Sequence, residues 1–132
     1  MVTHTGGCRC GLISAEASVD PFWTSYCHCR DCRKQTGAPV MVFVGFREDE
    51  QTWHGEPKTW HSAGVTRSFC AHCGSQIGYR DAKLPGEVYL SLGFMDEPER
   101  YPPVVHAFEK RRLPFLHIAD DLPRYDGFSI ER

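Results

Sequence analysis

The pattern of apolar and polar residues along the chain predicts short β-strands. Residues 13–19 alternate strictly, with Ile, Ala, Ala and Val separated by Ser, Glu and Ser, and this period of two is typical of a strand that buries one face. Pro21 ends that strand. Residues 88–92 alternate in the same way. Residues 40–44 form a continuous, partly β-branched apolar run, which predicts a core strand covered on both faces.

The remaining patterned segments keep the prediction mainly β. Extended segments are expected over residues 104–108 and 115–118. Trp-His pairs at residues 53–54 and 60–61 flank a Gly-Glu-Pro sequence, which predicts two strand edges around a turn. One short helix is predicted over residues 31–36, with the following glycine placed to end it. The expected fold class is therefore mainly β with short helical turns.

Length and composition favour one domain. A chain of 132 residues suits a single domain of ordinary size, so residues 1–132 are predicted to share one core. Nine prolines and twelve glycines favour many short elements over long helices. No internal repeat or linker interrupts the sequence.

The charge balance and the apolar runs limit the classes of partner. Fifteen basic and seventeen acidic residues give a net charge of −2, which argues against nucleic acid and anionic lipid as partners. Lys110-Arg111-Arg112 is the strongest basic run, and it is short. Residues 1–7 lack the apolar segment of a secretion signal, and the run at 40–44 is too short to cross a bilayer. We therefore expect a cytoplasmic protein with no membrane partner.

Cysteine is the most informative residue type in the sequence. Seven cysteines in a chain without a secretion signal favour metal ligation over a disulfide framework, which would leave one thiol unpaired. Zinc takes four ligands in a closed structural site, whereas a catalytic zinc keeps three protein ligands and one open position. Seven thiols therefore divide naturally into a set of four and a set of three.

The spacing of the cysteines suggests how they divide. Cys70 and Cys73 resemble a zinc knuckle, because a glycine follows the second cysteine and permits a tight turn. Cys8 and Cys10 are the natural partners of that pair, since neighbouring glycines let the backbone bend around a metal. The remaining cysteines would then form the open site: Cys27, Cys29 and Cys32.

Other interpretations of the cysteines remain open from spacing alone. Both sets could be closed structural sites without chemistry, the second completed by a histidine or another ligand. A thiol-redox role for Cys29 and Cys32 has less support, because no βαβ pattern surrounds them. His28 and His72 each lie between two cysteines and are expected to point away from the metal, with His28 supporting the ligands through a local hydrogen bond.

Four ordered segments resemble the glutathione-dependent formaldehyde-activating (GFA) family, which includes the centromere protein V type of domain. The resemblance spans nearly the whole chain. It rests on Gly7-Cys8-x-Cys10-Gly11, Cys27-His28-Cys29-x-x-Cys32-Arg33-Lys34-x-x-Gly37-Ala38-Pro39, Arg67-x-Phe69-Cys70-x-x-Cys73-Gly74-Ser75 and Ile118-Ala119-Asp120-Asp121-Leu122-Pro123.

The resemblance implies a fold, a metal content and an activity. It implies a zinc-stabilised β-tent of antiparallel sheets with two zinc ions. It further implies carbon–sulfur bond formation or cleavage by a lyase or synthase that acts on adducts of a glutathione-like thiol and an aldehyde such as formaldehyde. The partner would be a small-molecule thiol or a thiol–aldehyde adduct. The implied ligands are a structural set of Cys8, Cys10, Cys70 and Cys73 and a catalytic set of Cys27, Cys29 and Cys32.

Three polar residues next to the cysteines have roles that the sequence suggests. Arg33 and Lys34 come directly after the open site and could attract a substrate carboxylate, or could be solvated residues of a helix face. Ser75 is expected to cap the knuckle turn.

The alternative to an enzyme is a non-enzymatic zinc-binding interaction module, for which Lys110-Arg111-Arg112 is the best nucleic-acid feature.

Overall fold

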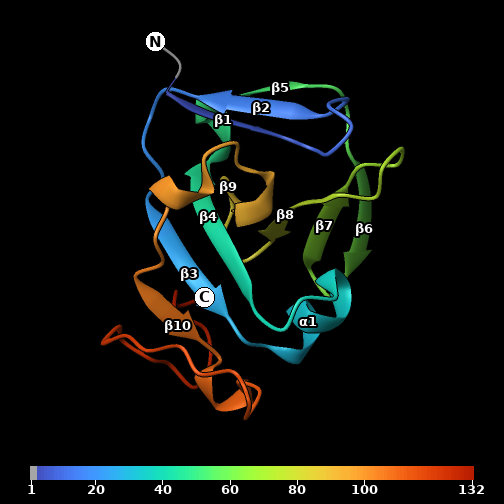
Figure 1. The fold of residues 1–132 in the computed structure, drawn as a ribbon. Helices are drawn as coiled ribbons and strands as arrows, with labels where there is room; N and C mark the ends of the chain where they lie inside the picture. The colour runs from blue at the N-terminus through green and yellow to red at the C-terminus, as the bar shows by residue number, and fades with distance from the viewer. Residues whose placement is uncertain (1–2) are drawn as a thin grey trace.

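The computed structural model describes residues 3–132 and arranges them mainly as two β-sheets (Figure 1). The smaller sheet has the order β1 (His4–Gly7), β2 (Ser14–Ala17), β5 (Gln51–His54), and it lies across the upper ends of the larger sheet in Figure 1. The larger sheet has the order β10 (Val105–Ala107), β3 (Trp23–Cys27), β4 (Met41–Arg47), β9 (Glu87–Ser91), β8 (Gln76–Asp81), β7 (Val65–Phe69), β6 (Lys58–Ser62).

Helical structure in the described part of the chain is limited to one α-helix and short 3-10 turns. Helix α1 (Arg30–Thr36) begins one residue before the predicted segment 31–36, and Gly37 ends it in the left-handed conformation, with its N–H bonded to the Arg33 carbonyl. Within residues 3–132 no helix is long and apolar enough to cross a membrane. The 3-10 turns cover Glu48–Glu50, Leu92–Phe94, Pro98–Arg100 and Glu109–Arg111.

The predicted core strand at residues 40–44 corresponds to β4, which lies between β3 and β9. Val44 pairs with Thr24 on one side and with Leu90 on the other, and its side chain is fully buried. Burial is complete only in the second half of the strand, since Met41–Phe43 are partly exposed. The prediction was therefore right in type and place, but not in burial over the whole run.

The hydrophobic core lies between the two sheets. The alternating residues Ile13, Ala15 and Ala17 point into it, as their period of two predicts. Gly6 in β1 lies against Phe94, where a Cβ atom would come within 2.7 Å of the phenyl ring and 2.8 Å of the backbone oxygen. Glycine is required here because the backbone oxygen cannot move aside. The core residues of the larger sheet include Val44, Phe46, Ile77, Val88 and Leu90.

The strand edges predicted at residues 53–54 and 60–61 lie in β5 and β6 on either side of a turn, and these two strands belong to different sheets. Two other sequence predictions need correction. Residues 115–118 form no strand, because Pro114 provides no N–H and Arg112 binds the Leu116 carbonyl at 2.6 Å in a turn. The larger sheet is not wholly antiparallel, because β10 pairs with β3 in parallel.

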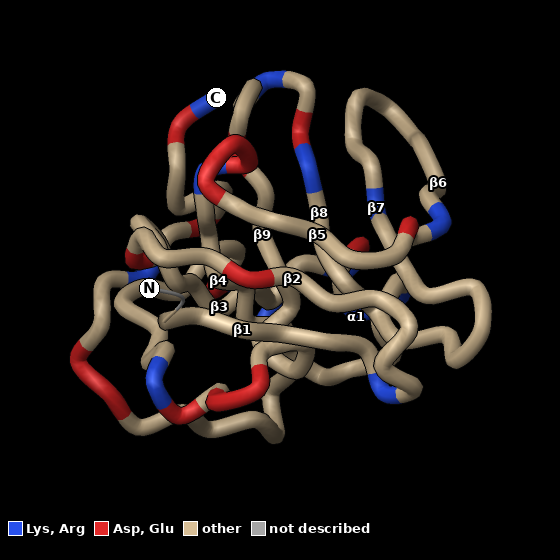
Figure 2. The backbone as a smooth tube through the Cα atoms, turned by 90° about the horizontal axis from the view of Figure 1, so that it is seen from above, with Lys and Arg blue, Asp and Glu red and all other residues tan. Residues whose placement is uncertain are grey.

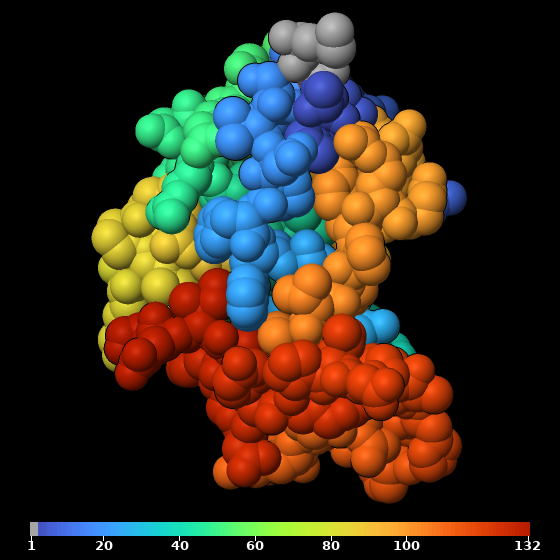
Figure 3. Space-filling model, turned by 90° about the vertical axis from the view of Figure 1, so that its left-hand side faces the viewer, coloured from blue at the N-terminus to red at the C-terminus, as the bar shows by residue number. Residues whose placement is uncertain are grey.

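The C-terminal segment closes one end of the molecule. Figure 3 shows it, in red, spread across this end beside residues of the β3 region. Backbone hydrogen bonds anchor it to β10, with the His106 N–H bonded to the Pro123 carbonyl at 2.9 Å and the Tyr125 N–H bonded to the His106 carbonyl at 2.8 Å. The end of the chain is therefore part of the folded structure near the end of β3.

Candidate metal centres and the adjoining pocket

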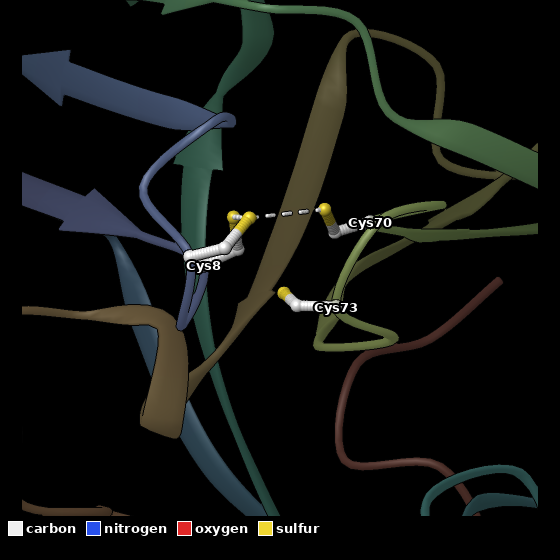
Figure 4. Close-up of side chains that lie close together, drawn as sticks. Cys8, Cys70 and Cys73 are labelled. Carbon is white, nitrogen blue, oxygen red and sulfur yellow. Dashed lines mark hydrogen bonds between the residues drawn. The ribbon is translucent and has the colours of Figure 1, made fainter.

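Four cysteines from two turns come together, and Figure 4 labels three of them, Cys8, Cys70 and Cys73. The turn after β1 carries Cys8 and Cys10, and the turn after β7 carries Cys70 and Cys73. All four sulfur atoms lie within 4.8 Å of one another. The second turn depends on Gly74, whose φ of 77° lets its N–H bond to the Cys70 carbonyl at 2.8 Å.

The geometry of this cluster fits a tetrahedral zinc ion. Zinc–sulfur bonds of about 2.3 Å place tetrahedral sulfur atoms about 3.8 Å apart. The Cys10 sulfur lies 3.5 Å from the Cys8 sulfur and 3.7 Å from the Cys70 sulfur. None of the seven cysteines forms a disulfide. The set that spacing grouped is therefore assembled in space.

Ser75 supports the knuckle turn, as its position suggests. Its hydroxyl accepts the Arg9 N–H at 3.0 Å and lies 3.1 Å from the Cys73 sulfur. Hydrogen bonds from Ser75 lower the pKa of the Cys73 thiol to about 5. Ser75 thus joins the two turns and favours the thiolate that a metal requires.

The second cluster contains the other three cysteines. Cys27 ends β3, Cys29 is the N-cap of α1, and Cys32 lies in the first turn of that helix. The Cys27 sulfur lies 3.4 Å from that of Cys29 and 3.5 Å from that of Cys32. The Cys32 N–H also donates to the Cys29 sulfur at 3.2 Å, so the capping interaction holds one ligand candidate in place.

Electrostatics within the second cluster favour a bound cation. Hydrogen bonds from the Cys27 and Cys32 thiols lower the pKa of Cys29 to about 2. The pKa of Cys27 is raised, because its thiol donates to both neighbours and is buried. One thiolate therefore forms readily and the others do not, since like charges at this separation repel. Three thiolates together would require a positive ion between them, and zinc is a cation that suits three cysteine ligands.

Arg67 is a site residue whose role could not be predicted from the sequence. It lies in β7 with a side chain that is 4% exposed, and it donates to the Asp31 carboxylate at 2.7 Å. The same nitrogen lies 3.7 Å from the Cys32 sulfur, and the guanidinium covers the Tyr79 ring. The signal in the sequence was its place in the segment Arg67-x-Phe69-Cys70-x-x-Cys73, which carries part of the family resemblance.

The three-cysteine cluster opens onto a cavity of about 270 Å³. None of the four-cysteine set lines this cavity. Most of the wall is apolar, and the two arginines in it are Arg67 and Arg132. The wall consists of Trp23, Ser25, Cys27, Cys29, Asp31, Cys32, Phe43, Val65, Arg67, Tyr79, Tyr89, Ala107, Phe108, Phe128, Ser129, Ile130 and Arg132.

Arg33 and Lys34 do not line this cavity. The Arg33 guanidinium donates to the carbonyl oxygens of His28 at 2.7 Å and Arg111 at 2.5 Å, so it anchors the loop to the C-terminal half. Lys34 is exposed on α1. Of the two roles considered for this pair, the carboxylate-binding one finds no support for Arg33.

His28 lies behind the three-cysteine cluster and takes part in a chain of hydrogen bonds. Its Nε2 lies 2.9 Å from Nδ1 of His106, whose Nε2 lies 2.9 Å from the Asp120 carboxylate. The two imidazoles are close to coplanar, with an angle of 14° between them, which suits an N–H···N hydrogen bond. A Glu109 carboxylate oxygen lies 3.5 Å from Nε2 of His28. His28, His106 and Glu109 therefore form a further group that could hold a metal ion. His72 is exposed.

Comparison with known proteins shows the family of this chain and a similar fold. The sequence model of the family described as glutathione-dependent formaldehyde-activating enzyme matches residues 3–111. The chain belongs to that family. A crystal structure of a Rhodobacter sphaeroides protein has a similar fold, with a TM-score of 0.58 and 19% sequence identity. The similarity covers 70% of this chain and 87% of that one.

Proposed function

We propose that this protein is a zinc-dependent carbon–sulfur lyase or synthase that acts on adducts of a small thiol and an aldehyde. One observation carries the proposal: the cysteine cluster with three members lines a cavity, and the cluster with four does not. Cys8, Cys10, Cys70 and Cys73 would hold a structural zinc, and Cys27, Cys29 and Cys32 a catalytic zinc. Family membership supports glutathione-related and formaldehyde-related chemistry.

The reaction requires no electron transfer. Addition of a thiol to an aldehyde forms one carbon–sulfur bond and moves the thiol proton to the carbonyl oxygen, and the reverse step breaks that bond. A zinc ion held by Cys27, Cys29 and Cys32 would bind the substrate thiol and lower its pKa.

Protein groups around the cluster have separate tasks in this scheme. Arg67 places a permanent positive charge beside Cys32, and Asp31 orients that guanidinium. The apolar cavity wall excludes water from the reacting carbon. His28, through His106 and Asp120, fixes the loop that carries Cys27 and Cys29.

NMR exchange spectroscopy with glutathione and formaldehyde tests the proposed activity. Zinc-loaded protein should accelerate exchange between the free thiol and its S-hydroxymethyl adduct, whereas zinc-stripped protein and the Cys29→Ser variant should not. Acid should lower the rate, because protons compete with zinc for thiolates. The enzyme proposal fails if zinc-loaded protein matches the buffer rate with glutathione and with a panel of other thiols and aldehydes.

The basic run at residues 110–112 offers the interaction-module alternative two exposed charges, Lys110 and Arg111. Arg112 donates to the Glu109 carboxylate at 3.0 Å and to the Leu116 carbonyl at 2.6 Å, so its charge is used within the fold. Basic and acidic residues are interspersed along the backbone in Figure 2.

We further propose a cytoplasmic location, since free cysteines persist in a reducing compartment.

A further inference from the structure

We infer that the thiol substrate carries a compact apolar group of about the size of an aromatic ring, in place of the charged peptide of glutathione. This inference rests on the proposed function and narrows its substrate class. The family match favours formaldehyde as the aldehyde, and formaldehyde has no hydrocarbon substituent, so an apolar group next to the reacting carbon–sulfur bond would belong to the thiol. The cavity of about 270 Å³ lies just below the common range for small-molecule sites, about 300–1,000 Å³, which suits a compact ligand.

Aromatic side chains make up much of the wall beside the three cysteines. The wall therefore presents to a ligand mainly cysteine sulfur and aromatic ring surface. The polar atoms of the aromatic side chains have hydrogen-bond partners within the protein. The Tyr79 hydroxyl donates to Asp81 at 3.0 Å, and the Tyr89 hydroxyl donates to Glu87. The Trp23 indole N–H donates to Ser129 at 3.3 Å. The aromatic residues of the wall are Trp23, Phe43, Tyr79, Tyr89, Phe108 and Phe128.

Both guanidinium groups of the wall are already paired. Arg67 binds Asp31 at 2.7 Å, and Arg132 binds Asp81 at 2.9 Å. Ser25, another polar residue of the wall, donates to the Tyr26 carbonyl at 2.8 Å. Glutathione carries two carboxylates, and burying a carboxylate without a charged partner is costly. The cavity therefore favours a thiol whose remaining atoms are apolar.

Part of the wall comes from residues that follow the family match. Phe128, Ser129, Ile130 and Arg132 line the cavity, whereas the matched residues end at 111. The Phe128 ring packs edge-on against Phe108 at 5.0 Å, and the Arg132 guanidinium covers it at 3.6 Å. Phe128 is held in this way although it is 51% exposed, so its open face is available to a ligand. Substrate choice in this chain thus depends on its C-terminal segment (Figure 3).

Calorimetric titration of the zinc-loaded full chain with 2-phenylethanethiol and with glutathione tests the inference. The aromatic thiol should bind at least about tenfold more tightly, because a ring fills the cavity and needs no partner for a carboxylate. Phe128→Ala should weaken its binding about fivefold. Phe115→Ala is the matched control, since Phe115 is 73% exposed and lies outside the wall, and it should bind the aromatic thiol as the parent does.

Glutathione binding as tightly as the aromatic thiol, unaffected by Phe128→Ala, overturns the inference. In that case Lys83→Met should weaken glutathione binding, because Lys83 lines the adjoining groove that shares Phe128 and Arg132 with the cavity. Turnover separates the two proposals. Selective binding of 2-phenylethanethiol with no turnover of any thiol–aldehyde adduct removes the enzyme proposal and keeps the apolar preference of the cavity. Efficient turnover of the glutathione adduct alone keeps the enzyme proposal and overturns the inference.

Discussion

The Arg67 guanidinium lies 3.7 Å from the sulfur of Cys32, although the two residues are 35 positions apart in the sequence. Arg67 comes from β7 and Cys32 from α1, so the packing of a helix against a strand creates this contact. The arginine is almost completely buried, and its partner Asp31 is 78% exposed. The buried positive charge is therefore shared between the Asp31 carboxylate and the Cys32 sulfur, and it favours a thiolate at Cys32.

Replacing Arg67 should weaken metal binding at the three-cysteine site alone. Arg67→Met keeps much of the side-chain volume but removes the charge, and the exposed Asp31 remains solvated. We expect about tenfold faster zinc loss to a chelator from this site, equivalent to about one pKa unit of thiolate stabilisation. Arg80→Met is the control, because Arg80 pairs with Glu48 and lies outside the cavity wall. Equal zinc loss from the two variants would contradict the role given to Arg67.

The metal content of the purified protein should be about two zinc ions per chain, because the seven cysteines form one closed set and one open set. Elemental analysis measures this directly. Cys32→Ser should reduce the content to about one ion per chain, since it removes a ligand from the open set only. A metal-free protein, or an iron–sulfur absorption spectrum, would contradict the assignment.

The two clusters should differ in their contribution to stability. Structural zinc can contribute on the order of 10 kcal/mol, which is comparable with the whole stability of a small domain. Cys8→Ser or Cys73→Ser should therefore lower the melting temperature far more than Cys32→Ser, because the four-cysteine set joins turns distant in sequence, whereas the three-cysteine set lies within residues 27–32. Thermal melts of the three variants measure this, and equal losses would show that the division is wrong.

Alanine substitutions at two glycines should distinguish the cost of a steric clash from the cost of backbone strain. Gly55 and Gly64 have φ values of 80° and 82°, which L-residues rarely adopt. A Cβ at Gly55 would lie 2.2 Å from the Leu12 carbonyl oxygen, whereas at Gly64 its nearest neighbour is 3.9 Å away. Gly64→Ala should cost about 1 kcal/mol in unfolding free energy from strain, and Gly55→Ala about 3 kcal/mol or more. Denaturant unfolding of both variants provides the comparison, and similar losses would rule out the clash.

The parts of this structure that the sequence predicted are local in origin. The division of the cysteines follows from spacing and adjacent glycines, and helix α1 follows from residues near Cys32 and Gly37. Each depends on the backbone within a few residues, which the sequence records directly.

The parts that were not predicted depend on contacts between distant segments. No periodicity in Val105–Ala107 indicates that it pairs with β3 in parallel. Nor does any local pattern place Arg67 beside Cys32, or Phe128 in the cavity wall. Arg33 shows the same limit. Its position after the three cysteines suggested that it binds a substrate carboxylate, but its guanidinium donates to the carbonyl of the distant Arg111 instead.

Asp81 should make the folded protein sensitive to acid. Burial alone would raise the pKa of its carboxyl, but the Lys83 N–H, the Arg132 guanidinium and the Tyr79 hydroxyl outweigh burial and lower the pKa below its usual value. A carboxyl with a lower pKa in the folded state stabilises the fold above its unfolded pKa, about 3.9, and this contribution is lost as the pH falls through the folded value. Asp81→Asn should therefore be less stable than the parent at pH 6, and the difference should shrink toward pH 3.

Chemical unfolding of the parent and Asp81→Asn across that pH range measures the difference directly. Loss of zinc in acid affects both proteins, so it cancels when the two are compared at each pH. Asp49→Asn is the control, because Asp49 is exposed in the turn Glu48–Glu50, and its stability should follow that of the parent at every pH. A constant difference between the parent and Asp81→Asn from pH 6 to pH 3 would mean that the hydrogen bonds of Asp81 do not depend on its charge.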